Sequence, residues 1–139
     1  MISFSPIIDL AASAKLTSVN MREYYERYGV AWDVAAIESQ TADLDNFDLI
    51  ADGVAVGAVR LSYESDCCYL RDLQVAEGYK NRGYGAAAIA KCVQLALSKG
   101  ARVLKLKVFQ ISPAYRLYER SGFVVESSDD RFYYMSRVL

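Results

Sequence analysis

The amino-acid sequence predicts a mixed α/β domain with one hydrophobic core, and three observations lead to this expectation. The chain of 139 residues is 53% apolar and 24% charged, a composition typical of folded globular proteins. Its apolar residues recur with a helical period in some segments and alternate with a period of two in others. Its length matches one ordinary domain, so we expect residues 1–139 to form a single domain without an internal repeat.

The first third of the chain predicts a short strand followed by two helices. The strand is expected near residues 2–4. Apolar residues at helical spacing over residues 9–28 lead to Gly29, a plausible helix stop, and a second short helix is expected over residues 32–40.

A run of strands comes next. Residues 47–51 and 54–63 are apolar and flank the pair Asp52-Gly53, which favours the positive backbone angles of a tight hairpin turn. Residues 67–75 form the next expected strand.

The second half alternates helices and strands. The clearest helix spans residues 83–99, with one apolar stripe and Gly100 as its stop. A strand over residues 103–109 carries Leu104, Leu106 and Val108 on one side and Lys105 and Lys107 on the other. Another helix is expected over residues 113–121, with Ser112 as its cap, and two strands, 123–125 and 132–138, end the chain.

Charge is segregated along the chain although its net value is only −1. Between Gly78 and Tyr118 there is no Asp or Glu. The same segment holds eight cationic residues, Lys80, Arg82, Lys91, Lys99, Arg102, Lys105, Lys107 and Arg116. Such a segment is either a local site for a polyanion or a solvated basic face, and the charge pattern alone leaves both interpretations open.

Several chemistries are excluded by composition. The chain has no histidine, so we exclude a Ser/His/Asp triad, a histidine base and a histidine-ligated metal, and we expect no metal. Cys67, Cys68 and Cys92 lack the spacing of a redox or metal pair and are interpreted as structural thiols. No segment has the length and apolarity of a membrane span or a signal peptide, so we expect a cytoplasmic protein with no membrane partner.

The segment over residues 69–86 predicts a site for a phosphate-bearing ligand. A strand runs into a glycine-bearing loop that opens the clearest helix. Gly83 and Gly85 allow close approach of the backbone, and the free N–H groups of a helix start favour phosphate oxygens. Lys80 and Arg82 add positive charge at the same place.

Residues 83–88 also satisfy a loose dinucleotide fingerprint, GxGxxA. A dinucleotide fold requires an acidic residue about 20 positions further on, whereas this chain has Phe109 and Gln110 there. The link from Val75 to Gly83 is also too long for the tight turn of that fold. We therefore disfavour a nicotinamide or flavin site.

Two motifs resemble the signatures of the GNAT N-acetyltransferases. Their coenzyme A loop has Gln or Arg, two residues, Gly, one residue, then Gly or Ala; here it is Lys80-Asn81-Arg82-Gly83-Tyr84-Gly85, with Lys in the first place. The run from Ser112 to Phe123 is similar to the second signature, NPAxxLYxxxGF, and departs from it only at Ser112. The resemblance spans roughly residues 44–139.

This resemblance implies a GNAT fold, with a mostly antiparallel twisted sheet that is splayed between strands 4 and 5 and flanked by about four helices. It implies an acetyl-CoA-dependent N-acetyltransferase that acts by direct attack in a ternary complex. The residues that it implies for binding acetyl-CoA are Leu73, Gln74, Val75, Lys80, Asn81, Arg82, Gly83, Tyr84, Gly85, Ala86, Ser112 and Tyr115.

The resemblance also implies catalytic roles. Tyr118 matches the family's proton donor to the departing thiolate. Asp72 is the candidate base; it could instead pair with Arg71 or act through water, and Glu64 or a water chain are rivals.

The amine acceptor is less well indicated. The chain offers aromatic and acidic residues that suit a cationic amine but that also fit an ordinary amphipathic helix face. They are Tyr24, Tyr25, Tyr28, Trp32, Glu23, Glu26, Asp33 and Glu38.

The expected partners are acetyl-CoA and an amine, with no nucleic acid, and the sequence leaves a homodimer open. The alternative function is a non-catalytic acyl-CoA sensor or interaction module with the same fold.

Overall fold

The computed structural model describes residues 2–30 and 33–139. These residues form seven strands and four α-helices, with one short 3-10 turn after the fourth strand. In chain order the elements are β1 (Ile2–Pro6), α1 (Leu10–Tyr28), α2 (Val34–Thr41), β2 (Asp45–Ala51), β3 (Val54–Glu64), β4 (Cys67–Val75), η1 (Glu77–Tyr79), α3 (Tyr84–Ser98), β5 (Val103–Phe109), α4 (Ala114–Arg120), β6 (Val124–Ser128) and β7 (Phe132–Val138).

The strands form one mixed sheet in the order β1-β2-β3-β4-β5-β7-β6. Every neighbouring pair is antiparallel except β4 and β5, which run parallel. The predicted hairpin turn is present, since both Asp52 and Gly53 have positive φ angles. The expected mixed α/β class and mostly antiparallel sheet are therefore confirmed.

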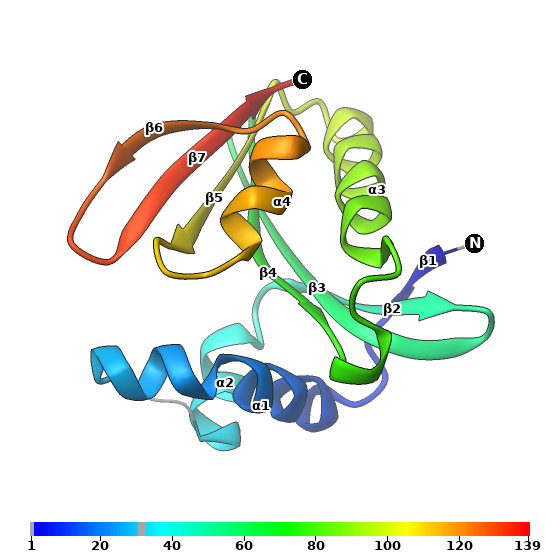
Figure 1. The fold of residues 1–139 in the computed structure, drawn as a ribbon. Coiled ribbons are helices and arrows are strands. Elements are labelled where there is room, and N and C mark those ends of the chain that lie inside the picture. The colour runs from blue at the N-terminus through cyan, green and yellow to red at the C-terminus, as the bar shows by residue number, and fades with distance from the viewer. Residues whose placement is uncertain (1, 31–32) are drawn as a thin grey trace.

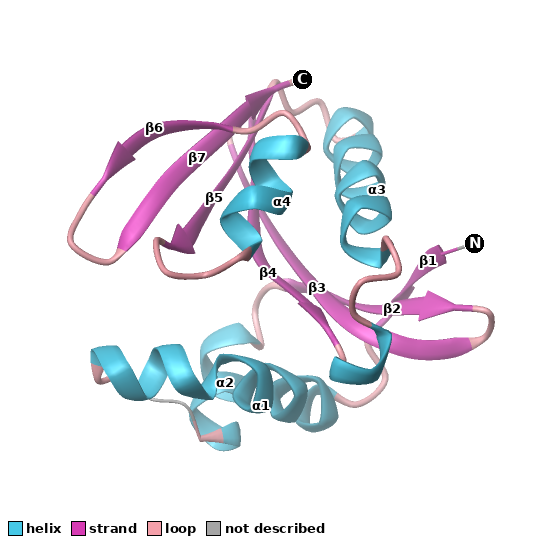
Figure 2. Cartoon of the chain, viewed as in Figure 1, coloured by secondary structure: helices cyan, strands magenta, loops and turns pink. Residues whose placement is uncertain are grey.

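The sheet opens between its two central strands. Register between β4 and β5 spans three residue pairs, from Cys67 opposite Val103 to Tyr69 opposite Lys105, and beyond these pairs the strands diverge (Figure 2). On its other side β4 carries a bulge, because Leu61 pairs with Leu70 and Arg60 with Asp72, so that Arg71 is extra. The expected splay between strands 4 and 5 is confirmed.

Helices cover both faces of the sheet (Figure 1). On one face, the small apolar residues of α3 pack with the sheet side chains Leu61, Cys68 and Leu104, and α4 adds Tyr118 to the same core. On the other face α1 lies across β3 and β4, with α2 beside it. None of the helices in the described ranges is both long and apolar enough to cross a bilayer.

Helix ends follow the sequence signals. The side chain of Asp9 accepts a hydrogen bond from Ala12 N at the start of α1, and Gly29 closes that helix with a φ of 67°. The second helix begins at Val34 with Asp33 as its cap; Trp32, where it was expected to begin, lies outside the described residues. The N-cap of α4 is Pro113 rather than the predicted Ser112, because the helix begins one residue later, at Ala114. The Ser112 hydroxyl still accepts a hydrogen bond from Ala114 N at 3.2 Å.

Gly57 lets β3 and β4 approach where β4 leads into the loop. A Cβ on Gly57 would lie 2.1 Å from the backbone carbonyl oxygen of Gln74. We therefore expect Gly57→Ala to lower the free energy of unfolding by about 1–3 kcal/mol, because the obstacle is backbone that must shift. Denaturant titration measures this, with Gly78→Ala as the control because its added Cβ meets nothing within 4 Å. Equal stability of the two variants would contradict the prediction.

Candidate active site

A cavity of about 830 Å³ opens at the divergence of β4 and β5, a volume within the range of small-molecule sites. Its wall comes from β4, the loop after β4, the first turn of α3, the end of β5 and helix α4, with α1 on the opposite side. Most residues predicted for the site lie in this wall. They are Asp72, Leu73, Gln74, Val75, Lys80, Asn81, Gly83, Tyr84, Gly85, Ala86, Ser112 and Tyr118.

Two of the predicted residues lie outside the cavity wall, namely Arg82 and Tyr115. The guanidinium of Arg82 lies 5.4 Å from the centre of the Tyr79 ring. The Tyr115 hydroxyl donates to Glu119 Oε2 at 2.9 Å, and its ring packs on Tyr133. Both side chains are therefore engaged by protein groups in this conformation.

The free edge of β4 supplies backbone hydrogen-bonding groups to the cavity. Just after β4, Ala76 N donates to Val56 O at 2.8 Å, so the backbone of Ala76 faces β3. Because these directions alternate along an antiparallel pair, the N–H and C=O groups of Leu73 and Val75 face away from β3. They point into the gap that β5 leaves open.

The loop from Lys80 to Gly83 turns the chain sharply into α3. Asn81 and Gly83 both have positive φ angles, of 62° and 81°. The N–H groups at the start of α3 precede the first intrahelical bond, which Ala87 N makes to Gly83 O, and so they are available to a ligand. Gly85 has a packing role, since a Cβ there would lie 2.9 Å from a methyl group of Leu117 in α4.

Tyr118 is a buried tyrosine whose side chain borders the cavity. The residue is 7% exposed, and its ring packs edge-on against Phe123. Among the described residues the Tyr118 hydroxyl has no hydrogen-bond partner. Every fully buried side-chain oxygen in these residues has one, so the Tyr118 oxygen is accessible, and Tyr118 lines the cavity. Burial raises the pKa of Tyr118 above its ordinary value of 10, and the negative charge of Asp72 adds to the rise. The hydroxyl is therefore protonated at neutral pH.

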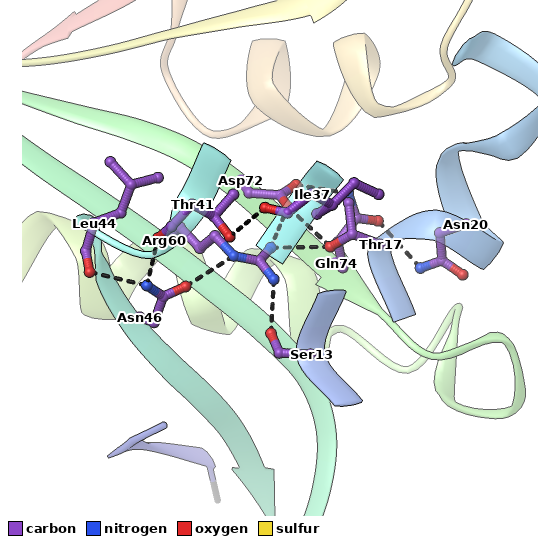
Figure 3. A network of polar contacts seen from close by, with 10 residues as sticks. All are labelled: Ser13, Thr17, Asn20, Ile37, Thr41, Leu44, Asn46, Arg60, Asp72 and Gln74. Atoms are coloured by element: carbon purple, nitrogen blue, oxygen red, sulfur yellow. Dashed lines mark hydrogen bonds and ion pairs between the residues drawn. The ribbon is translucent and has the colours of Figure 1, made fainter. Parts of the chain in front are cut away.

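Asp72 is held by an ion pair with Arg60, whose side chain is completely buried (Figure 3). The same carboxylate oxygen, Oδ2, accepts a hydrogen bond from the Thr17 hydroxyl at 3.0 Å. The other oxygen, Oδ1, accepts from Gln74 Nε2 at 2.6 Å. Three of the roughly four lone-pair positions of the carboxylate are thus engaged. Asp72 pairs with Arg60 rather than with Arg71, which instead donates to Ser62.

The polar network around Arg60 ties α1 to the two central strands. Arg60 also donates to Asn46 Oδ1 at 2.9 Å, to Thr17 Oγ1 at 2.9 Å and to Ser13 Oγ at 2.7 Å. At the cavity end, Asn20 Nδ2 donates to Gln74 Oε1 at 3.1 Å and to Val75 O at 2.9 Å. A continuous chain of hydrogen bonds therefore joins the buried guanidinium, through Asp72, Gln74 and Asn20, to the free edge of β4. Figure 3 draws this chain as far as Asn20.

Aromatic rings and cations line the side of the cavity nearest α1. The ring of Phe109 stacks on those of Tyr24 and Tyr28, with centroids 5.5 and 5.3 Å apart, and packs on Phe132 at 4.5 Å. We call this region the α1 end of the cavity and define it by Tyr24, Phe109, Phe132, Arg71, Lys107 and Arg131.

The acidic residues considered for amine binding lie elsewhere. Glu23 and Glu26 line a shallow depression on the outer side of α1, and neither Asp33 nor Glu38 is in the described wall of the main cavity. Tyr24 and Tyr25 do line it. Of the two interpretations that the sequence left open, acidic contacts to an amine are therefore not formed at the main cavity among the described residues, where α1 contributes tyrosines and not its carboxylates.

The cysteines are poor nucleophiles. All three are buried and free of disulfides. Burial raises the pKa of Cys68 to about 11 and that of Cys92 to about 12, so both remain thiols at neutral pH. Within the described part of the chain, no three metal-ligating side chains gather at one place.

The sequence analysis missed Arg60, Asn20 and Phe109. Arg60 had a signal, because it is one cation in the apolar run from Val54 to Leu61. Phe109 had another, since strand alternation places it on the side of Lys105 and Lys107. Asn20 is one polar residue among many in α1, and no pattern marks it.

Comparison with known proteins agrees with this architecture. Streptothricin acetyltransferase from Streptomyces lavendulae is 30% identical over 100 residues, which cover 69% of this chain and 53% of that protein. This chain thus spans about half the length of that curated relative. The crystal structure of Nourseothricin acetyltransferase aligns with a TM-score of 0.60 and 26% identity, over 69% of this chain and 65% of that chain.

A second crystal structure matches the whole fold. It is that of the paia N-acetyltransferase from Thermoplasma acidophilum in complex with coenzyme A, and it aligns with a TM-score of 0.81 and 16% identity, over 100% of this chain and 99% of that chain. The family model of the Acetyltransferase (GNAT) family matches residues 13–123, which is most of the sequence. On this evidence, the chain belongs to the acetyltransferase (GNAT) family.

Proposed function

We propose that this protein transfers the acetyl group of acetyl-CoA to an amine acceptor by direct attack in a ternary complex. One observation carries the proposal: a single cavity joins the glycine loop, the free edge of β4 and the Tyr118 side chain. Coenzyme A is the ligand named for the Thermoplasma acidophilum structure of the same fold, which supports this assignment.

The glycine loop and the start of α3 fit the phosphates of coenzyme A. The helix start offers N–H donors and the positive end of the helix dipole. Lys80 adds a cation, although its ammonium here pairs with Glu77 at 2.9 Å. Apart from Asp72, which Arg60 neutralises, the described wall of the cavity contains no carboxylate that would repel an anion.

The reaction requires a new C–N bond from the amine to the acetyl carbon while the thioester C–S bond of acetyl-CoA breaks. The N–H groups of Leu73 and Val75 would bind the pantetheine arm, with the Val75 N–H donating to the carbonyl oxygen as negative charge develops on it. Tyr118 would donate a hydrogen bond, and finally its proton, toward the departing sulfur.

The amine must lose a proton during this reaction, and we propose that Asp72 accepts it through a bridging water. Its carboxylate already accepts from Arg60, Thr17 and Gln74, and these three contacts leave little room for direct contact with the acceptor. Glu64 is a poor rival, because it pairs with Cys67 at the far end of β4, where β4 and β5 are still joined.

Two measurements test the proposal. We expect calorimetry to detect binding of coenzyme A and not of NAD, because the loop and helix start are built for phosphates without an acidic partner for a ribose. We also expect thiol release from acetyl-CoA in the presence of a suitable amine from a broad panel. Binding of NAD alone would refute the cofactor assignment. Binding of acetyl-CoA with no thiol release for any amine would favour the non-catalytic sensor instead.

A further inference from the structure

The α1 end of the cavity carries positive charge that the protein does not neutralise. Arg71 donates to Ser62 Oγ at 2.8 Å and lies over the Tyr69 ring. The ammonium of Lys107 lies 4.6 Å from the Phe132 ring centre, and the guanidinium of Arg131 lies 5.2 Å from that of Tyr28. Among residues 2–30 and 33–139, no carboxylate lies within ion-pair distance of any of these three cations.

The acidic groups nearest to these cations have other partners. Asp72 is bound by Arg60. Asp129 accepts hydrogen bonds from the backbone N–H groups of Arg131 and Phe132 and from the Tyr134 hydroxyl, and it does not line the cavity. These hydrogen bonds lower the pKa of Asp129 more than its attraction to the Arg131 charge does, so Asp129 interacts with that cation only weakly. The net charge presented to a ligand at the α1 end is therefore positive.

The phosphates of acetyl-CoA do not account for these cations. Leu106 and Val108 of β5 are buried in the core that α3 and α4 cover, so Lys107 and Phe109 project from the opposite face. Phe109 confirms this orientation, since it stacks on Tyr24 and Tyr28 of α1. The glycine loop leads into α3, on the face away from α1 (Figure 1). The two positive regions therefore lie on opposite faces of the sheet, at the two ends of the one cavity that opens between β4 and β5.

We propose that the acceptor of this enzyme is a small amine that also carries an anionic group, either a carboxylate or a phosphate. The inference rests on the proposed function, and it deepens that function by naming the acceptor class. Lys107 and Arg131 would bind the anion, and the rings of Phe109 and Phe132 would cover an aromatic or apolar body. A polycationic amine would face uncompensated repulsion from the same three cations.

Matched pairs of amines that differ only in the anionic group test this proposal. We would measure thiol release with phenylalanine against phenethylamine, and with phosphoethanolamine against ethanolamine, and include spermidine as the polycation. We expect the anionic member of at least one pair to have a kcat/KM about 10-fold to 100-fold above its partner, as one or two charge-assisted hydrogen bonds supply. The two pairs separate a carboxylate preference from a phosphate preference.

A charge-reversal variant locates the effect. In Lys107→Glu with Arg131→Glu we expect the preference to be lost or inverted, with coenzyme A affinity unchanged. Lys105→Glu is the control, because Lys105 lies on the same strand and the same face but does not line the cavity. Preference of the wild type for spermidine or for the partners that lack the anionic group, or a preference unmoved by the double reversal, would overturn the inference.

A binding measurement keeps the inference separate from the proposed function. Thermal shift with coenzyme A present would compare the amines with and without the anionic group in the absence of any turnover. If no amine caused thiol release, the proposed enzyme would fail. Selective stabilisation by the anionic amine, abolished by the double reversal, would still support the anion site, and equal shifts for both members of each pair would refute it.

Discussion

Replacing Tyr118 by phenylalanine is expected to lower kcat by about 10²-fold to 10³-fold while acetyl-CoA still binds. The hydroxyl has no partner among the described residues, so its removal takes away a donor aimed at the cavity and no bond of the folded state. Because its pKa is raised, the hydroxyl keeps its proton at neutral pH and can donate a hydrogen bond to the departing sulfur. The expected loss in kcat therefore equals the effect of removing one preorganised hydrogen-bond donor to the negative charge that develops on the departing sulfur.

The variant should fold as well as the wild type, because a largely buried hydroxyl without a protein partner contributes little to stability. Tyr63→Phe is the matched control. Its hydroxyl interacts with Cys68 near the far end of β3, where burial raises the pKa of Tyr63 to about 12, and it lies outside the described cavity wall. We expect Tyr63→Phe to leave kcat unchanged; an equal loss in both variants, or none in Tyr118→Phe, would exclude Tyr118 as the donor.

The pH profile adds an independent check on Tyr118. A tyrosine with its ordinary pKa would be half deprotonated at about pH 10, whereas desolvation moves the pKa of Tyr118 upward. Its donor form is therefore present throughout the neutral and mildly alkaline range. We expect kcat at saturating substrates to show no decline assignable to Tyr118 below about pH 10. A decline of kcat below pH 10 that was absent in Tyr118→Phe would contradict a raised pKa of Tyr118.

Local patterns predicted the elements that local physics determines. The Asp52-Gly53 turn requires positive φ angles that this pair adopts readily, so the hairpin follows from two residues. The loop into α3 likewise follows from Gly83 and the apolar stripe behind it. Strand β6 was expected to end at Val125 and extends to Ser128, because pairing with β7 orders residues whose exposed, polar character carries no strand pattern.

Long-range contacts could not be predicted in the same way. Arg60 and Asp72 lie on different strands, and the bulge at Arg71 decides which side chain of β4 faces α1. A shift of one residue would have turned Asp72 to the other face. The α1 end depends on the docking of a helix more than 80 residues away from Phe109, which no period in the sequence encodes. The Arg60–Asp72 pair and the packing of α1 on Phe109 determine the charge of the site and hold α1 against the sheet.

Arg60→Met is expected to lower the free energy of unfolding by about 3–5 kcal/mol. The side chain is completely buried and donates to Ser13, Thr17, Asn46 and Asp72. An apolar replacement of similar length fills the space but leaves the partly buried Asp72 carboxylate without its counter-charge. A loss of this size is a large part of the 5–15 kcal/mol that typically stabilises a folded domain.

A double-mutant cycle separates the charge effect from simple loss of packing. Combining Arg60→Met with Asp72→Leu removes both charges, so we expect the pair to be more stable than Arg60→Met alone. Arg60→Lys keeps the charge but loses the planar fork that reaches several partners, and should lie between Arg60→Met and the wild type. Denaturant midpoints at an unchanged slope measure all five proteins, namely the wild type, Arg60→Met, Asp72→Leu, the double variant and Arg60→Lys.

The same cycle tests whether the network positions the active site. Asn20, Gln74 and Asp72 connect Arg60 to Val75 O on the free edge of β4, so loosening the guanidinium should disturb the backbone that we assign to the acetyl donor. At a temperature where Arg60→Lys is fully folded, we expect its kcat to fall more than its coenzyme A affinity, because the glycine loop and α3 are outside the network. Additive stability losses in the cycle, together with a wild-type kcat in Arg60→Lys, would show instead that Arg60 and Asp72 act independently and that the network has no role in catalysis.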